Sequence, residues 1–412
     1  MAQSFNPFTP NQPIDPEYFA GRIGEVVKVK SALSQTRHGK IQHVLLTGER
    51  GIGKTSLAIY AQYLGRQPNE TLGTDFNFAT SYYTVERNQN LADICRGLTA
   101  KLLDGIDRGL ASKCFNKLKD MKLHFAVQVP WFGQFGLNSP DDGQGDTYLH
   151  TDFVKAIEES WDEMKETHNG ILLILDELHN LNTFKGVGSF FKVVSERLVV
   201  DGYRQIMFLA TGLPKIASDI SEDDPSAPRI FTYVELNRLT EDESLSIVNR
   251  CISNTSKTID DQAAKHIAMR SGGFPYFLHQ LGYDAFDADT DDLIDLQDVY
   301  SGLVKSLIQF ERMFFGKMYK SVEGKQKQKI VDELAHGGNI PVLPSQLEKK
   351  LKIKNIHQYL RSLEKDGIIE RYGNSVKLSS DLLSIYIVLF KTAPRKTKQE
   401  SSRAIKAAAS SD

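Results

Sequence analysis

The chain has 412 residues, of which 41% are hydrophobic and 25% are charged. This composition is typical of a folded soluble protein, and the length allows two or three domains. The three cysteines, Cys95, Cys114 and Cys251, lie far apart without metal-ligand spacing, which argues against structural zinc and favours a reducing cytoplasm. The longest apolar runs are too short to span a bilayer, so we expect no membrane contact.

The formal net charge of −2 conceals an asymmetry along the chain. Residues 1–320 carry 33 Lys and Arg against 42 Asp and Glu, whereas residues 321–412 carry 17 against 10. A basic C-terminal part that follows an acidic body predicts an anionic partner for that part.

Four prolines stand within the first 18 residues, and proline at this density prevents regular helices and strands. We therefore expect an extended strap over residues 1–18. Residues 18–25, YFAGRIGE, then open a helix that runs to about His38.

A buried strand, a glycine-rich loop and a helix follow one another over residues 41–64. Residues 48–55, GERGIGKT, fit the pattern G-x-x-x-x-G-K-[ST] directly after an apolar run. The glycines let backbone N–H groups approach phosphate oxygens, and the N-terminus of the following helix adds a positive field. Lys54 is expected to reach the β- and γ-phosphates of ATP, and Thr55 to offer its hydroxyl to Mg²⁺. The predicted nucleotide-binding residues are Gly48, Glu49, Arg50, Gly51, Ile52, Gly53, Lys54, Thr55 and Ser56.

Residues 171–177, ILLILDE, contain five consecutive aliphatic residues, which suit a strand buried on both faces of a parallel sheet. Asp176 is expected to hold the Mg²⁺ shell, and Glu177 to polarise the water that attacks the γ-phosphate. The run from Asp176 to His179 also spells the DExH box of a helicase family. The other helicase motifs are missing, so we expect His179 to be an ordinary residue at the start of the next helix.

The pattern F-x-G-R-x-x-E at residues 19–25, the loop at 48–55 and the acidic pair at 176–177 together resemble the AAA+ ATPases. The resemblance is closest to the branch of archaeal-type ATPases, origin-recognition initiators and STAND signalling ATPases. It implies an α/β P-loop NTPase with a parallel sheet and a helical lid. In that family the first segment borders the adenine, so the resemblance nominates Phe19 and Arg22 for the base pocket. The alternative is a packed helix start.

Residues 104–150 are the part least similar to that family. An alternating stretch at residues 122–129, followed by Trp131, Phe132 and Phe135 among glycines, predicts a hairpin that lies on the sheet. Residues 138–146 are expected to form a polar loop. The alternative is that these aromatic side chains are exposed and contact DNA or a neighbouring subunit.

A further apolar strand ends at Thr211, where AAA+ proteins carry a polar residue, more usually Asn, that senses the γ-phosphate. We expect an acidic loop at residues 219–228, followed by Arg229. The resemblance makes Arg229 the candidate arginine finger, which would act on ATP bound by a neighbouring subunit and would require an oligomer. Arg197 and Arg238 are alternatives, and any of the three can instead form a surface ion pair.

From Thr240 the helical periodicity is continuous, as expected for an AAA+ lid. Within the sequence SGGFP, Pro275 stands where initiators carry an arginine that reaches the nucleotide. A G-x-P element resembles the STAND and archaeal-type branches instead, where it packs near the adenine and phosphates. This difference favours a slow nucleotide switch.

Three short helices over residues 325–366 and a hairpin over residues 367–378 resemble a winged helix. Ile356, Leu360 and Leu363 should face the core of this module. In helix-turn-helix modules the third helix lies in the major groove. The residues predicted to face DNA are Lys354, His357, Gln358, Arg361 and Lys365 on the third helix, with Arg371, Tyr372, Asn374 and Lys377 on the wing. The alternative is a packing or protein-interaction module.

The expected organisation is a strap at 1–18, a P-loop core at 19–238, a helical lid at 239–322, a winged helix at 323–390 and a basic disordered tail at 391–412. We predict a Mg²⁺-dependent ATPase, oligomeric when ATP is bound, that couples its nucleotide state to binding of duplex DNA or to assembly on it. The alternative is a STAND-type signalling or defence switch that acts through a protein partner. A metabolic kinase is a weaker match, because no site for an acceptor substrate is evident.

Overall fold

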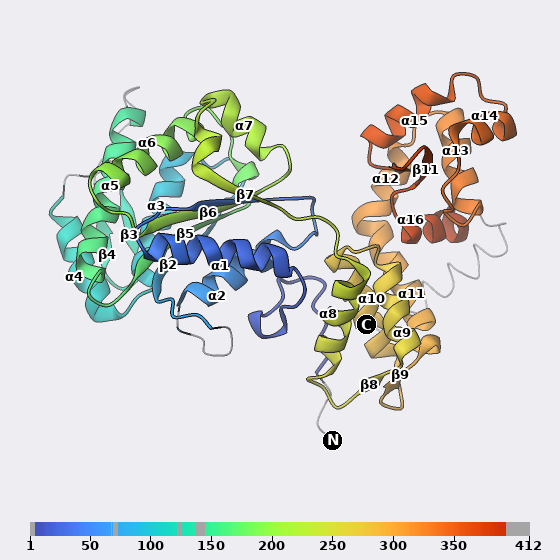
Figure 1. Cartoon of the computed structure of the whole chain (residues 1–412), viewed down its shortest axis with the longest axis horizontal. Helices are drawn as coiled ribbons and strands as arrows, with labels where there is room; N and C mark the ends of the chain where they lie inside the picture. Colours follow the sequence, from blue (N-terminus) through green and yellow to red (C-terminus); the bar gives the residue numbers. More distant parts are fainter. Residues whose placement is uncertain are drawn as a thin grey trace. The chain divides into compact units, whose positions relative to one another are not determined.

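The computed structural model of the chain describes residues 5–66, 68, 73–121, 123, 125–136 and 145–392. The predicted polar loop at 138–146 and the C-terminal tail therefore fall largely outside the described residues. The chain divides into two units, residues 13–237 and residues 1–12 together with 238–412 (Figure 1). We describe each unit by itself.

Five parallel strands form the sheet of the first unit, in the order β2-β5-β6-β1-β7. Their bounds are β1 (His43–Thr47), β2 (Phe78–Thr84), β5 (Gly170–Asp176), β6 (Ile206–Gly212) and β7 (Phe231–Glu235). The predicted strands at 44–47, 171–175 and 206–210 are confirmed, and β7 was not predicted. Because parallel strands share a direction, the loops that follow β1, β5 and β6 meet at one edge of the sheet.

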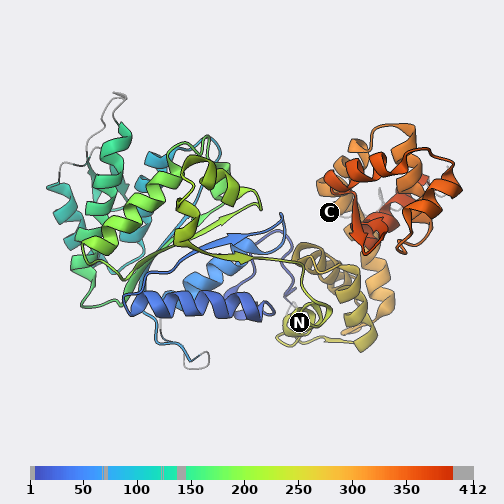
Figure 2. The same ribbon diagram turned by 45° about the horizontal axis from the view of Figure 1, so that its top comes forward.

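Helices cover both faces of this sheet, as its continuous apolar strands require. In β5, Ile171, Leu173 and Leu175 belong to the core formed with α3, α5 and α6. Leu172 points the other way and lies against Gly65 of α2. Figure 2 shows the dark-blue helix α1 and the green helices of this unit on opposite sides of the sheet. The helices are α1 (Ile23–Arg37), α2 (Lys54–Arg66), α3 (Leu91–Asp104), α4 (Arg108–Lys119), α5 (Gly145–Met164), α6 (Val187–Val200) and α7 (Ile216–Asp223).

The acidic stretch at 219–228 was predicted to be a loop, and this prediction was wrong for residues 219–223. Its first half belongs to α7, which packs through Ile216 and Ile220, four residues apart and both buried. The Asp223 carboxylate accepts from the backbone N–H groups of Gly186 (2.6 Å) and Ser189 (3.0 Å) at the start of α6. The Asp223 side chain therefore caps a neighbouring helix, a contact that local sequence does not reveal.

The region 104–150 contains the predicted hairpin, formed by β3 (Val127–Val129) and β4 (Gly133–Phe135). Helix α4 precedes it and was not predicted. Phe135 is 3% exposed, as expected for a hairpin that lies on the sheet. Trp131 is 85% exposed, as expected in the alternative of exposed aromatic side chains. Arg108 lies over the Trp131 ring, 5.5 Å from its centroid.

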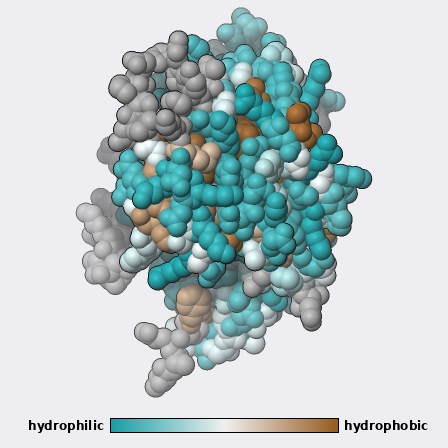
Figure 3. Space-filling model, turned by 90° about the vertical axis from the view of Figure 1, so that its left-hand side faces the viewer, coloured by the Kyte–Doolittle hydropathy of each residue, from teal (hydrophilic) through white to brown (hydrophobic). Residues whose placement is uncertain are grey.

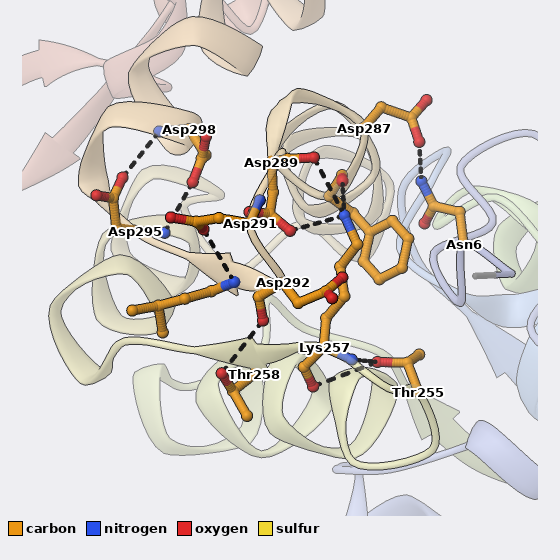
Figure 4. Close-up of polar contacts among 12 residues, drawn as sticks. Asn6, Thr255, Lys257, Thr258, Asp287, Asp289, Asp291, Asp292, Asp295 and Asp298 are labelled. Carbon is orange, nitrogen blue, oxygen red and sulfur yellow. Dashed lines mark hydrogen bonds and ion pairs between the residues drawn. The ribbon is translucent and has the colours of Figure 1, made fainter. Parts of the chain in front are cut away.

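In the second unit, α8 to α11 form the helical lid, interrupted by a small parallel pair of strands, β8 and β9. Lys257 fixes the acidic connection between α10 and α11. Its ammonium group lies 2.7 Å from the Asp289 carboxylate and 4.5 Å from the centre of the Phe286 ring (Figure 4). The bounds are α8 (Glu241–Ile252), β8 (Thr258–Ile259), α9 (Asp261–Arg270), α10 (Pro275–Ala288), β9 (Leu293–Ile294) and α11 (Leu296–Phe310).

The N-terminal strap begins on this lid. Phe8 is 1% exposed and lies against Gly282 of α10, where a Cβ would stand 2.4 Å from the Phe8 ring. Burial lowers the pKa of His279 to about 4, so its ring is neutral and Nδ1 accepts the Thr9 N–H at 3.3 Å. Asn6 donates to Asp287 (Figure 4). Residues 16–18 form the short 3₁₀ turn η1 (Pro16–Tyr18) in a stretch predicted to be irregular.

After α11, a π-helical turn and a short helix lead to the helix–hairpin segment, which we define as residues 325–378. Ile356, Leu360 and Leu363 of its third helix are buried, as predicted. Val342 forms a β-bridge with Val376 of the hairpin. The elements are η4 (Glu311–Phe315), α12 (Gly316–Ser321), α13 (Lys325–His336), α14 (Pro344–Leu351), α15 (Ile356–Lys365), β10 (Ile369–Tyr372), β11 (Ser375–Leu378), α16 (Asp381–Tyr386) and η5 (Ile387–Thr392). Across the described residues, no helix combines the length and apolarity needed to span a membrane.

Candidate functional site

The phosphate loop, residues 48–55, joins β1 to α2 at the carboxyl edge of the sheet. Lys54, the first residue of α2, is only 5% exposed. Its ammonium group donates to the carbonyl oxygens of Gly48 (3.0 Å) and Glu49 (2.8 Å). Burial lowers the pKa of Lys54, whereas the carboxylates of Glu177 and Asp176 act to raise it. The loop therefore curls around a buried cation.

Glycine is required at the first position of this loop because the chain is crowded there. A Cβ on Gly48 would stand 2.9 Å from both the Leu236 carbonyl oxygen and the Ile52 side chain. Gly51 and Gly53 have φ angles of 75° and 98°, in the region that L-residues rarely adopt. A backbone with such φ angles allows successive N–H groups to face one point, as anion binding requires.

Asp176, the last residue of β5, accepts two hydrogen bonds from neighbouring strands. Thr211 Oγ1 of β6 donates to it at 2.6 Å, and Tyr82 Oη of β2 donates at 2.9 Å. The Thr211 oxygen in turn accepts the backbone N–H of Glu177 at 3.0 Å. Burial, and next the adjacent Asp176 carboxylate, raise the pKa of Tyr82, which stays protonated and remains a donor. One acidic side chain is thus oriented by the strands on both sides of it.

Glu177 adopts a left-handed backbone conformation, with φ 59° and ψ 38°. For a residue other than glycine this conformation costs free energy, and such positions gather at functional sites. Its carboxylate lies 3.2 Å from His179 Nε2. Burial lowers the pKa of His179 despite the nearby Glu177 carboxylate, so we assign the ring as neutral at pH 7. His179 was expected to be an ordinary residue, yet it directly faces the candidate base.

Arg22 and Phe19, predicted for a base pocket, lie beside the phosphate loop and α2. Arg22 is 4% exposed and donates to the carbonyl oxygens of Ile52 (2.6 Å) and Asn237 (3.0 Å). Phe19 stacks on Tyr60 of α2, with ring centroids 4.4 Å apart. Arg22 therefore braces the loop, a role the sequence did not indicate, and contact of either residue with a base stays a prediction.

The remaining predicted residues differ in setting. Glu49 and Arg50 are exposed, Thr55 and Ser56 are half-buried, and Ser56 Oγ accepts the Ile14 N–H at 3.4 Å. Arg229 is exposed at the end of the short 3₁₀ turn η3 (Ala227–Ile230).

Of the two alternative arginines, Arg197 donates to Thr151 and Arg238 pairs with Glu370. Pro275 begins α10 in the second unit, after Gly273, whose carbonyl oxygen accepts the Leu239 N–H at 2.8 Å.

A magnesium ion held together with a nucleotide fits the donors at this edge. The described part of the chain contains no cluster of three or more His, Cys, Asp or Glu side chains able to hold a metal by themselves. Mg²⁺ bound with phosphates needs only one or two protein ligands, because phosphate oxygens and water complete the shell. The Thr55 hydroxyl follows Lys54 directly, and the Asp176 carboxylate is already oriented, so both suit this use. Their assignment to Mg²⁺ stays a prediction.

Tyr82 is the member of this site that sequence reasoning missed. The signal was available only in part, since the sequence of residues 74–86 predicts a strand that contains this tyrosine. The register that places Tyr82 beside Ile174 of β5 depends on which strands are neighbours, and local sequence does not give that order.

The helix–hairpin segment shows a second set of predicted residues. The side chains on α15 and just before it that were predicted to face DNA are all exposed: Lys354, His357, Gln358, Arg361 and Lys365. The hairpin differs, because its two cations are paired within the segment. Arg371 lies 3.2 Å from Glu364, and Lys377 lies 3.2 Å from Glu370.

Comparison with known proteins agrees with this architecture. Residues 18–184 match the family model described as an AAA ATPase domain. The ORC2 protein of Aeropyrum pernix, described in ADPNP and ADP complexes, aligns over 98% of this chain and 99% of its own, with 15% identity and a TM-score of 0.59. A Walker-type ATPase of Pyrococcus abyssi aligns over 90% of this chain and 96% of its own, with 14% identity and a TM-score of 0.51.

At these identities the two likenesses concern the fold alone. A comparison with curated proteins gives no match. The parallel sheet, the loop after β1 and the domain match lead to one conclusion: the chain has an α/β P-loop NTPase fold, and its residues 18–184 are similar to an AAA ATPase domain.

Proposed function

We propose that this protein binds and hydrolyses ATP with Mg²⁺ and couples its nucleotide state to binding of duplex DNA. The observation that carries the ATPase part is the pair formed by buried Lys54 and oriented Asp176 at one edge of the sheet. Lys54 would exchange its two backbone carbonyl partners for phosphate oxygens. This exchange suits a buried ammonium group, because charge-assisted hydrogen bonds are the stronger ones.

The other residues would divide the chemistry among them. Mg²⁺ would neutralise charge on the phosphates, with Thr55 and Asp176 as its protein ligands. Glu177 would accept a proton from the attacking water, with His179 Nε2 3.2 Å from its carboxylate. Thr211 would hold the Asp176 carboxylate and the Glu177 backbone in fixed positions relative to each other through its two hydrogen bonds. Phe19 and Pro275 would border the base, and Arg229 would act across a subunit interface.

DNA binding is proposed for the helix–hairpin segment, which we interpret as a winged helix. An exposed polar face on α15, opposite a fully buried apolar face, supports this interpretation. The face carries three cations, Lys354, Arg361 and Lys365, which can contact phosphates and base edges. The order of its three helices and hairpin suits insertion of the third helix into the major groove.

The experiment is ATP turnover by the full chain, with and without duplex DNA, at low and moderate salt. We expect turnover that DNA stimulates, with a stimulation that fades as salt rises, because phosphate contacts release counterions. Glu177→Gln should retain ATP binding and lose turnover, and turnover that survives this change would remove Glu177 as the base. Turnover that is indifferent to DNA at low salt would contradict the coupling.

A second candidate, a nucleotide-gated switch that acts through a protein partner, has one specific observation in its favour. The wing cations Arg371 and Lys377 are already paired with Glu364 and Glu370, so the hairpin offers fewer free charges to DNA. The face of the protein in Figure 3 is mainly hydrophilic, with apolar side chains in separate patches. We place DNA binding first because Lys354, Arg361 and Lys365 are exposed on α15 or just before it.

A further inference from the structure

The chain passes between the two units at Gln12–Pro13 and again at Asn237–Arg238. At the second crossing, which we call the hinge, the two consecutive residues are held by different partners. The Asn237 carbonyl oxygen accepts from Arg22 of the first unit. The Arg238 guanidinium pairs with Glu370 of the second unit at 2.8 Å. The hinge therefore joins two networks through one peptide bond.

On the side of the first unit, the hinge lies directly along the phosphate loop. Arg22 bridges Asn237 and Ile52, since its two Nη atoms bond to their carbonyl oxygens. The Leu236 N–H donates to Thr47 at 2.7 Å, and there is no room for a Cβ between Gly48 and the Leu236 carbonyl. A loop that shifts at either end to admit phosphates must therefore move the chain that leads into the hinge.

On the side of the second unit, an ion pair links the hinge residue Arg238 to Glu370 of the hairpin. The Arg238 guanidinium lies 4.7 Å from the centre of the Phe274 ring, and the next residue, Leu239, bonds to Gly273. Glu370 of β10 is shared, because one carboxylate oxygen faces Arg238 and the other faces Lys377. An Arg238 that stays close to Glu370 repels Lys377 and weakens its hold on the same carboxylate. Movement of Arg238 thus changes how free Lys377 is to bind a phosphate.

We propose that Arg22 and Arg238 are positioning residues that connect the phosphate loop to the hairpin, so that nucleotide state sets the availability of Lys377. This inference rests on the proposed function, of which it supplies the regulation. It gives Arg238, an alternative candidate for the arginine finger, a role within its own chain. It also gives a role to Gly273, whose carbonyl oxygen accepts the Leu239 N–H and so holds the chain just after the hinge.

The test compares the affinity of a fluorescent duplex DNA for the full chain in the presence of a non-hydrolysable ATP analogue and of ADP. For the natural sequence we expect the DNA affinities of the analogue-bound and ADP-bound forms to differ by a factor on the order of ten. In Arg238→Ala and in Glu370→Gln the ratio should fall to about one while analogue affinity stays within about twofold. The double variant should be no worse than either single variant, because both changes remove one contact.

The matched control is Arg270→Ala. Arg270 also pairs with an acidic residue of the same unit, Asp381 at 3.9 Å, and its side-chain exposure of 38% resembles the 36% of Arg238. This control should keep the nucleotide-dependent ratio. An unchanged ratio in Arg238→Ala, or an equal loss in Arg270→Ala, would overturn the inference.

Hydrogen exchange of the hairpin amides provides a readout that needs no DNA. Exchange at residues 369–378 should differ between the analogue-bound and ADP-bound forms, and this difference should vanish in Arg238→Ala but persist in Arg270→Ala. If the natural protein binds no duplex in either state, the proposed DNA function fails while this readout still decides the hinge. A hairpin that exchanges identically in both nucleotide states of the natural protein would end the inference by itself.

Discussion

At the carboxyl edge of the sheet, Lys54 and Asp176 lie buried, and each side chain is held by two short hydrogen bonds. Lys54 contacts two carbonyl oxygens, and Asp176 accepts from both neighbouring strands. On α15, by contrast, the cations stand on a solvent-exposed helix face whose underside alone is packed. Both regions suit an anion, yet they are built in opposite ways.

The difference suits the function that we propose for each region. A site that reacts with one phosphate chain benefits from groups fixed in advance, because reorganisation then costs little during the reaction. A surface that meets many phosphates along a duplex can remain mobile and rely on counterion release. We therefore expect the first region to respond to single-atom changes and to tolerate salt, and the second to do the reverse.

The largest effect is expected from Lys54→Ala. Loss of the only buried ammonium group in the phosphate loop should weaken ATP binding by at least about a hundredfold, since charged hydrogen bonds are worth about 1.5–3 kcal/mol each. Titration with a fluorescent ATP analogue measures it. Lys215→Ala is the control, because Lys215 is 75% exposed and pairs with Asp219 on the surface. A loss smaller than about tenfold would show that burial of this cation matters little for binding.

The next effect concerns the crowding at Gly48. Gly48→Ala should lower the stability of the first unit by about 2 kcal/mol, because the added Cβ meets the Leu236 backbone as well as a side chain. Thermal unfolding should show a decrease of about 4–8 °C. Gly24→Ala is the matched control, since nothing lies within 4 Å of a Cβ at that position in α1. If both variants melt together, the contact between the loop and Leu236 is looser than the structure indicates.

Tyr82→Phe should have a smaller effect, confined to chemistry. It removes one of the two bonds to Asp176 while the ring stays in place, so turnover at limiting Mg²⁺ should fall by about tenfold, with less change at saturating Mg²⁺. Tyr83→Phe removes a hydroxyl from the next residue, which packs against the core on the other side of β2, and should leave turnover unchanged. Equal losses in the two variants would point to strand stability instead.

The smallest effect, and the one that sharpens the contrast, is expected on α15. Arg361→Ala should weaken duplex binding only a few-fold and reduce the slope of log affinity against log salt by about 0.9. Lys305→Ala, which removes an exposed cation from α11 in the same unit, should leave the slope unchanged. If Arg361→Ala leaves the slope intact, α15 does not contact phosphate through this residue.

Much of the nucleotide site could be predicted because its signals are local. The loop at 48–55 and the strand that ends at Asp176 carry their chemistry in a few consecutive residues, and the structure places them at one edge of the sheet. The buried face of α15 could be predicted for the same reason, from the spacing of its apolar residues.

What could not be predicted depends on contacts between distant segments. Tyr82 needed the order of the strands, and Arg22 needed the path of the chain at Asn237, 215 residues later. Helix α7 was hidden because its many acidic residues obscured the two isoleucines that pack it. In each case, a partner elsewhere in the fold decides what a residue does.

The packing of Phe8 against α10 has a consequence for folding during synthesis. Thr9 binds His279, which lies 270 residues later, so the strap is translated long before its partner. At elongation rates of about 5–20 residues per second, roughly 15 to 55 s pass between the synthesis of Phe8 and that of Gly282, against which it packs. The lid therefore cannot complete its core until Gly282 has been translated, and this gives chaperones a defined interval in which to engage Phe8.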